Sequence, residues 1–210
     1  MNTNRKLPEF NTIRVVGKCL LLIQEGGKPE ILIDGKGSGI NTQFEVQDNE
    51  LLIYAIPDND FGSETPIPKI IITYIKIKSV ILTGSIDLYT RNKITGKSFA
   101  LFLNGTGNIN LEVDVVNLDC TVVKDGTICV IGDATSSFIM LLGIGTYQGR
   151  DLDSGVVSVE ISNNGIATVS AECDLIGSIK NGGTLFYKGT PSINGLSIEG
   201  NSKMLPLKGR

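Results

Sequence analysis

Acidic side chains that recur at one level of a repeated sequence unit are the best candidates for chemistry in this chain. Three stand seven residues after a glycine that closes a short apolar segment, and two more flank the same level in the unit between them: Asp114, Asp133 and Glu172, then Asp151 and Asp153. Stacked carboxylates repel one another, and Ca²⁺, which takes roughly 6–8 oxygen ligands, would relieve that repulsion. The spacing predicts a calcium site, with separated, solvated loop acids as the alternative interpretation.

Other familiar catalytic arrangements are excluded by composition. The chain has no His, which removes Ser-His-Asp and Cys-His catalysis and every imidazole metal site. Its four cysteines lack CxxC spacing, so we expect free thiols. The glycines at 143, 145 and 149 do not match a dinucleotide-binding motif, because Gln148 breaks the pattern and a strand is expected where a helix is needed. We expect these glycines to occupy corners of the chain.

Net charge and hydropathy limit the kinds of partner and the cellular location that this chain is expected to have. A net charge of −3 without a basic face argues against nucleic acid, which proteins normally bind through Lys and Arg. The sequence contains no run of 18 apolar residues, so no membrane-spanning segment is predicted. The first ten residues also lack the apolar core of a signal peptide. We therefore expect a secreted or envelope protein if a leader precedes this sequence, and a cytoplasmic one otherwise.

The elements that must position these residues are strands. Ile, Val and Thr make up 57 of the 210 residues and Ala only five, which excludes a helical bundle. Short apolar segments end in glycine-bearing turns whose closing glycines, at 107, 126, 145, 165 and 183, lie 19, 19, 20 and 18 residues apart. An earlier copy ends at Gly84, 23 residues before Gly107, and a degenerate copy follows at 196–202. We expect the glycines to turn corners at positive φ.

The repeats keep one register, which predicts the fold. Apolar residues occupy the positions four before the closing glycine and two and four after it, while polar residues occupy the positions between. Alternation with a period of two places these columns on opposite faces of a strand. A repeat near 19 residues with this alternation predicts an all-β, single-domain parallel β-helix, in which each repeat forms one coil.

The domain is expected to span 10–204, between an N-terminal tail at 1–9 and a C-terminal tail at 205–210. Regular coils occupy 82–204, and a cap with opening strands occupies 10–81. In that opening part, a loop with three prolines at 57–68 interrupts the sheets. The strands expected there are 13–16, 19–23, 31–33, 44–46, 51–55 and 70–77.

The outward polar columns suggest a binding surface. A regular, largely uncharged β surface can hydrogen-bond an extended polymer such as a polysaccharide, or a second copy of the chain. Phe186 is expected to face outward, whereas Tyr147 and Tyr187 fall in inward columns and are expected to pack in the core. The predicted ligand-binding residues are Thr127, Thr146, Gln148, Thr168 and Phe186.

The two ends of the sequence resemble a bacterial family. The opening Phe10-Asn-Thr-Ile-Arg-Val-Val-Gly-Lys-Cys-Leu-Leu-Leu-Ile-Gln-Glu-Gly26 and the ending Gly183-Thr-Leu-Phe-Tyr-Lys-Gly-Thr-Pro191 are similar to those of the head GIN domain family of auto-transporter adhesins. The glycine turns between them resemble the family's Gly-Ser-Gly-Asp repeats. The resemblance covers about residues 10–204. It implies a parallel β-helix in an envelope or secreted setting, and no catalytic residues that could be carried over.

Three functions remain open on these grounds. The first is a non-enzymatic, adhesin-like protein that contacts glycans or other macromolecules through its polar face. The second is a structural module that self-assembles end to end as a homo-oligomer, as bactofilins do, although Pro191, Pro206, Lys203 and Lys208 are expected to blunt the C-terminal end. The third is a calcium-dependent polysaccharide lyase, in which Arg150 would act beside the acidic column. Calcium is the one cofactor that the sequence suggests.

Overall fold

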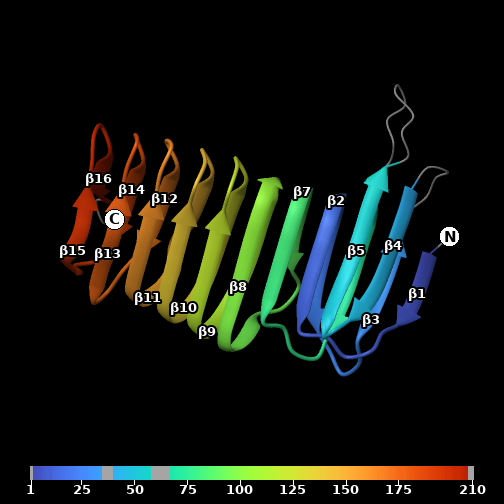
Figure 1. Ribbon diagram of the computed structural model, residues 1–210. Coiled ribbons are helices and arrows are strands. Elements are labelled where there is room, and N and C mark those ends of the chain that lie inside the picture. Colours follow the sequence, from blue (N-terminus) through green and yellow to red (C-terminus); the bar gives the residue numbers. More distant parts are fainter. Residues whose placement is uncertain (1, 35–39, 58–66, 208–210) are drawn as a thin grey trace.

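The structure, a computed structural model, describes residues 2–34, 40–57 and 67–207. These residues form strands, turns and connections without a helix, and all sixteen strands in them join one continuous hydrogen-bonded sheet (Figure 1). The strands are β1 (Asn2–Lys6), β2 (Thr12–Glu25), β3 (Glu30–Asp34), β4 (Ile40–Gln47), β5 (Glu50–Pro57), β6 (Lys69–Tyr74), β7 (Ser79–Thr90), β8 (Ile94–Thr106), β9 (Asn108–Val122), β10 (Thr127–Leu141), β11 (Thr146–Ile161), β12 (Ile166–Ser170), β13 (Asp174–Ile179), β14 (Thr184–Lys188), β15 (Ser192–Ile198) and β16 (Lys203–Pro206).

The chain winds into a parallel β-solenoid, which confirms the predicted fold. Residues in matching positions of successive coils pair in parallel: Ser79, Ala100, Asp119, Phe138, Ser158, Ile176 and Gly195. These partners are 21, 19, 19, 20, 18 and 19 residues apart, so each coil takes about 20 residues. Stacked coils lie about 4.8 Å apart, the ordinary spacing of hydrogen-bonded strands.

Each coil has three sides, and each side stacks into a ladder. The first ladder is formed by 50–55, 12–17, 79–84, 100–105, 119–122, 138–141, 158–161, 176–179 and 195–198. The second is formed by 69–74, 20–25, 88–89, 108–111, 127–130, 146–149, 166–170, 184–188 and 203–206. The third is formed by 94–96, 113–115, 132–134 and 152–154. The first ladder faces the viewer in Figure 1.

The two ends of the solenoid differ. At the N-terminal end, β4 pairs antiparallel with β5, and β1 and β3 continue the sheet antiparallel beyond β6. Residues 2–6, expected to be a tail, therefore form part of the cap. At the other end, β15 and β16 each pair with one strand only within the described residues, and β16 includes Leu205 and Pro206 from the expected C-terminal tail. Lys208 and residues 58–66 of the expected proline loop lie outside the described part.

Inward residues form the core, as the columns predict. The row Leu103, Val122, Leu141 and Ile161 pairs coil to coil, and each of these side chains is at most 1 % exposed. The strand expected at 70–77 ends at Tyr74, and a connection follows it. The cysteines are free: two are buried, Cys129 is half-buried and Cys173 is exposed.

The closing glycines are required for a different reason from the one expected. Among the five, only Gly107 has a positive φ. At the other four, an added Cβ would meet the inward side chains of Leu103, Val122, Leu141 and Ile161, respectively, for Gly126, Gly145, Gly165 and Gly183. The close approach of this turn to the core column, rather than backbone conformation, therefore excludes a side chain there.

Positive φ is instead required at the corner between the first and second ladders. Gly17, Gly84 and Gly105 stack in register at this corner with φ of 125°, 122° and 159°. A Cβ on Gly84 would overlap the carbonyl oxygen of Gly17, and one on Gly105 would overlap that of Gly84. Gly84 therefore matches Gly105, 21 residues later, and the expected match with Gly107 is wrong.

Candidate functional site

The predicted contact residues lie on the outer surface of the second ladder. Asn110, Cys129, Gln148, Thr168 and Phe186 form one row, each paired with the next across five coils. Thr127 and Thr146 pair with each other in the neighbouring row, which continues to an exposed Ile166. We call these seven residues, without Ile166, the polar face. All five predicted residues thus belong to one continuous surface.

A β-bulge interrupts this face and creates a groove in it. Cys129 pairs with Gln148, but Ile131 pairs with Asp151, so β11 carries one extra residue here. Bulges redirect side chains, and Arg150 is exposed beside this one. A groove of about 360 Å³ opens at this point, lined by Cys129, Val130, Ile131, Gln148, Arg150, Asp151, Thr168 and Leu207.

The groove combines hydrogen-bonding groups with two opposite charges. None of the ion pairs among the described residues involves Arg150 or Asp151, so both charged groups remain available to a ligand. Burial and, secondly, the charge of Asp151 raise the pKa of the Cys129 thiol. That thiol is therefore protonated at neutral pH and is a poor nucleophile. The groove is suited to holding a polar ligand.

An aromatic side chain adjoins the polar row at its C-terminal end. Phe186 is half-buried, opposite Thr168 on one side and Leu205 on the other. Leu205 is 43 % exposed, so the row ends in two apolar side chains next to the hydroxyl and amide groups of the polar face. The row therefore offers one aromatic ring for stacking and several polar groups for hydrogen bonds.

The two tyrosines of the repeat point inward, as expected. Tyr147 is 1 % exposed, and burial raises its pKa well above the ordinary value. Gly149 follows it in the same strand, and an added Cβ there would lie 2.5 Å from Cε1 of Tyr147. Gly149 is therefore not a corner glycine, contrary to expectation, and its missing side chain makes room for the tyrosine ring. Tyr187 is half-buried and packs against the core.

The acidic residues do not gather into one cluster. Asp114, Asp133 and Asp153 pair in register on the third ladder, and all three are exposed. Lys93 Nζ lies 3.9 Å from Asp133 Oδ2. The bulge separates Asp151 from this column and places it in the groove of the polar face.

Glu172 lies in the next coil beside the third ladder, and its backbone N–H donates to the carbonyl oxygen of Ser154 at 3.0 Å. No group of three His, Cys, Asp or Glu residues within 2–34, 40–57 and 67–207 could hold a metal ion. Calcium binding by Asp114, Asp133, Asp151, Asp153 and Glu172 stays a prediction without geometric support.

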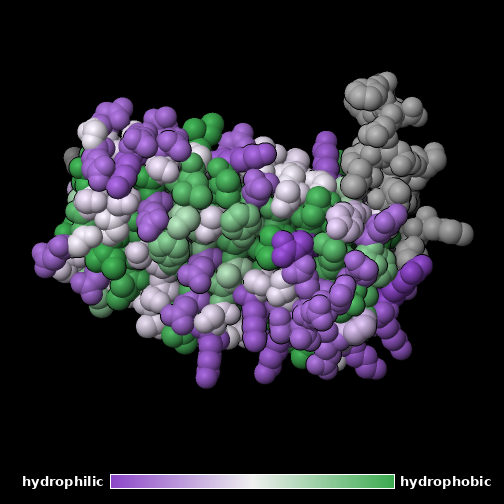
Figure 2. Space-filling view, viewed as in Figure 1, coloured by the Kyte–Doolittle hydropathy of each residue, from purple (hydrophilic) through white to green (hydrophobic). Residues whose placement is uncertain are grey.

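A second surface, which the sequence reading missed, lies on the first ladder. Many of its outward side chains are apolar, and Figure 2 shows apolar surface across these strands, although Arg14 lies beside Ile81 and Thr121 separates Phe102 from Met140. Three of the apolar side chains are well exposed: Tyr54 at 39 %, Phe102 at 38 % and Leu142 at 43 %. We define the apolar face as Tyr54, Ile81, Phe102, Phe138, Met140 and Leu142.

The signal for the apolar face is present in the repeat. The position five before the closing glycine alternates with the inward column and therefore faces outward. It holds Phe102, Thr121 and Met140 in consecutive coils, which pair with one another. The sequence prediction used the inward columns and the outward columns after the turn, so it did not include the outward row before the turn.

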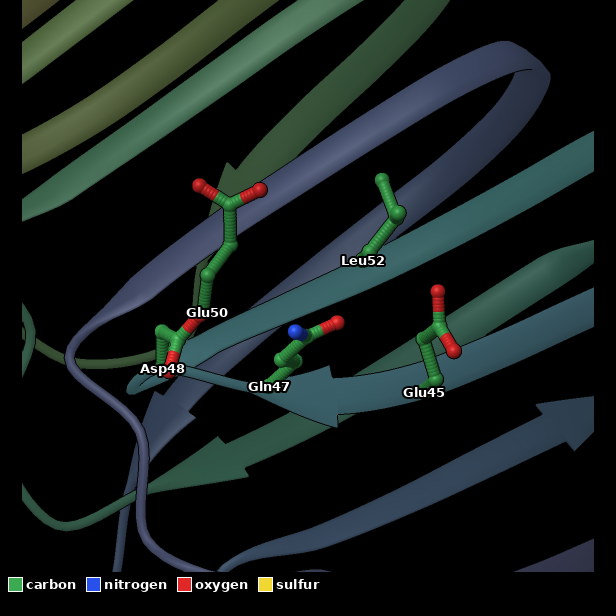
Figure 3. Close-up of a pocket in the computed structure, with 5 residues that line it drawn as sticks. All are labelled: Glu45, Gln47, Asp48, Glu50 and Leu52. Atoms are coloured by element: carbon green, nitrogen blue, oxygen red, sulfur yellow. The ribbon is translucent and has the colours of Figure 1, made fainter.

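A second hollow lies at the β4–β5 hairpin and is acidic. It measures about 320 Å³ and is lined by Glu45, Gln47, Asp48, Glu50 and Leu52 (Figure 3). Glu50 is already paired, because it accepts hydrogen bonds from Arg14 Nε at 2.6 Å and Nη2 at 3.1 Å. That bidentate pair raises the pKa of Arg14 and neutralises one carboxylate of the hollow.

Comparison with known families identifies the chain. The family described as "Putative auto-transporter adhesin, head GIN domain" matches residues 9–191. The chain belongs to this family. The resemblance seen in the sequence is therefore confirmed, and this head GIN domain carries the polar and apolar faces described above.

Solved structures share the fold of this head GIN domain. The structure of a protein described as an adhesin from Bacteroides fragilis has a TM-score of 0.88 at 20 % sequence identity. That of a similarly described protein from Parabacteroides merdae has a TM-score of 0.74 at 17 % identity. A structure from Parabacteroides distasonis titled as a lipid binding protein has 0.63 at 20 % identity. In each case the alignment covers 99 % of this chain and 96 % of the other.

Among curated proteins, no match to the chain was found. Within the described residues there is also no helix with the length and apolar character needed to cross a membrane.

Proposed function

We propose that this head GIN domain is a non-enzymatic adhesion module of the cell surface or envelope that holds an extended polysaccharide along its polar face. The observation that carries the proposal is the row from Asn110 to Phe186, which stays in register across five coils. A polymer lying along the solenoid axis would meet a new side chain about every 4.8 Å. The fold thus offers a repeating ligand a repeating site.

The chemistry of the polar face suits a glycan. Its central groups are the amide of Gln148 and the hydroxyl of Thr168, which donate and accept hydrogen bonds as sugar hydroxyls do. Phe186 adds an apolar surface against which a sugar ring can stack. Arg150 and Asp151 in the groove give the site orientation, because charged groups make the stronger hydrogen bonds to hydroxyls.

Binding rather than catalysis is supported by the state of the groove. The Cys129 thiol is protonated, as its raised pKa implies, and Asp151 is the one carboxylate among the described residues that line the groove. Hydrolysis of a glycosidic bond ordinarily uses two carboxyl groups on opposite sides of the bond. Membership in an adhesin-named family supports the same conclusion.

A glycan-array screen tests the proposal. The purified protein is applied with calcium and again with EDTA, beside the double variant Gln148→Ala/Thr168→Ala and the control Thr121→Ala. Thr121 presents a half-buried hydroxyl on the first ladder, so the control removes a hydroxyl from a different side of the solenoid.

We expect saturable binding to one glycan class, retained in EDTA and by Thr121→Ala, and lost in the double variant. Absence of binding to any glycan, or equal binding by the double variant, would contradict the proposal. Loss of binding in EDTA would move the site to the acidic column.

A further inference from the structure

A larger groove lies away from the polar face, where the irregular N-terminal coils meet the first regular coil. It measures about 670 Å³, within the range of roughly 300–1,000 Å³ typical of small-molecule sites. One wall is the connection 75–78, and the other is the start of β8, residues 95–100. Neither wall belongs to the polar face or to the β4–β5 hollow.

The groove arises from a mismatch in coil length. The coil from Ser79 to its partner Ala100 takes 21 residues, whereas the next takes 19. Its third side, residues 94–96, pairs with β9, and within the described residues no strand pairs with its other edge. The short connection 75–78 of the preceding coil leaves that edge uncovered, which opens the groove.

Its floor is apolar and contains a buried hydroxyl. Tyr74, Ile77 and Phe99 line it with exposures of 2 %, 6 % and 1 %. The Tyr74 hydroxyl oxygen is buried without a hydrogen-bond partner in the described part of the chain. A buried polar group in that state destabilises the protein, and a ligand atom that supplied a partner would relieve the loss.

Its rim is basic. Lys76, Lys78 and Lys97 line the groove and are exposed, and no ion pair among the described residues involves any of them. Two carboxylates also line it, from Glu25 and Asp119, so lysines outnumber acids in a protein whose net charge is −3. An apolar floor under a lysine rim is complementary to a molecule with an apolar body and one negative charge.

We propose that this groove binds a small amphipathic carboxylate. Its apolar body lies on Ile77 and Phe99, and its carboxylate meets the ammonium groups of Lys76 and Lys97 and accepts a hydrogen bond from the Tyr74 hydroxyl. This site is independent of the glycan site, so either can fail while the other stands.

Titration calorimetry with dodecanoate, below its micelle concentration, tests the proposal. The comparison ligand is dodecyltrimethylammonium, which has the same chain and the opposite charge. The test variant is Lys76→Glu/Lys97→Glu, and the control is Lys124→Glu, which reverses an exposed lysine far along the chain in the turn before Gly126.

We expect saturable binding of dodecanoate by the wild type and by Lys124→Glu, at least tenfold weaker binding by the double variant, and no saturable binding of the cation. Equal binding of both amphiphiles, or no saturable binding of dodecanoate, would overturn the proposal. Binding of an extended acidic peptide along β8 in place of dodecanoate would also overturn it.

The floor is tested separately with Tyr74→Phe. Removing an unpartnered hydroxyl should raise the melting temperature of the free protein and reduce the further rise that dodecanoate causes. A rise with dodecanoate equal to that of the wild type would place the ligand away from Tyr74 and contradict the assigned pose. The free-protein melt shows directly whether the variant folds.

Discussion

The polar and apolar faces overlap in two coils, those of Phe102 and Met140, but have opposite chemistry. Both are outward surfaces of parallel ladders that cover one shared core. On the polar face, Gln148 and Thr168 occupy the central coils, whereas Phe102 and Met140 occupy outward positions of the apolar face. The inward columns therefore determine the fold, and the outward columns are free to determine what each side contacts.

The exposed apolar residues of the first ladder are unusual for a surface. Scattered apolar side chains need no explanation, whereas neighbouring ones, such as the paired Ile81 and Phe102, mark surfaces that contact other molecules. Tyr54, Phe102 and Leu142 are each more than a third exposed on this face. The comparison separates a hydrogen-bonding surface from a hydrophobic one, and the following substitutions test that separation.

The largest effect is expected at the corner that joins the two faces. Gly84→Ala would force a Cβ into the Gly17 carbonyl at a φ of 122°, so we expect a loss of about 3 kcal/mol or more in the free energy of unfolding. Urea denaturation measures it. The control is Gly27→Ala, where an added Cβ meets nothing within 4 Å. Equal stabilities of the two variants would contradict the stacked corner.

Alkaline pH should weaken the core that both faces share. Burial and, secondly, the charge of Asp87 raise the pKa of Cys19 from about 9 to about 12. The folded protein therefore holds this proton more tightly than the unfolded chain, and its contribution to stability is complete below pH 9 and is lost as pH rises toward 12. Denaturation at several pH values should show a shallower alkaline decline for Cys19→Ala than for the wild type. The same slope for both would contradict this contribution. Cys173→Ala, at an exposed thiol, is the control.

A smaller effect is expected on the polar face itself. Gln148→Ala removes one amide from the row, so we expect the affinity for the glycan selected on the array to fall about tenfold, equivalent to about 1.4 kcal/mol. The free energy of unfolding should change little, because the side chain is exposed. Titration calorimetry measures the affinity, and Thr121→Ala should match the wild type. An unchanged affinity for Gln148→Ala would remove it from the site.

The smallest effect on glycan binding is expected on the apolar face. Phe102 is 38 % exposed and otherwise buried, so Phe102→Ser should lower the free energy of unfolding by about 2 kcal/mol and leave glycan affinity unchanged. Fluorescence of an apolar dye bound to the protein should fall, because an exposed aromatic ring of the face is removed. Weaker glycan binding by this variant would show that the two faces are not functionally separate.

Much of the fold could be predicted because local sequence pattern determines it. Alternation fixed the inward row that contains Leu103, Val122 and Leu141, and the glycine spacing gave the coil length. The N-terminal cap could not be predicted, because its order, β1-β3-β6-β2, depends on pairings between distant segments. The pairing of Gly84 with Gly105 likewise depends on one longer coil, which a fixed period does not reveal.

The candidate site was predicted only where the register is regular. Thr127, Thr146, Gln148 and Thr168 share a surface because a period of two continues through β10, β11 and β12. The bulge before Asp151 inserts a residue, so spacing alone could not separate Asp151 from Asp153. The groove beneath Lys97 was also out of reach, because it results from a difference in length between neighbouring coils.

Chemical-shift mapping of the isotope-labelled protein with the glycan selected on the array is the most direct test of the polar face as the binding surface. The account predicts that the largest shifts fall on the second ladder, at Gln148, Thr168 and Phe186 and on the side-chain amide of Gln148. Phe102 and Met140 on the first ladder should not move. Shifts centred on Phe102, or spread evenly over the molecule, would contradict the central claim.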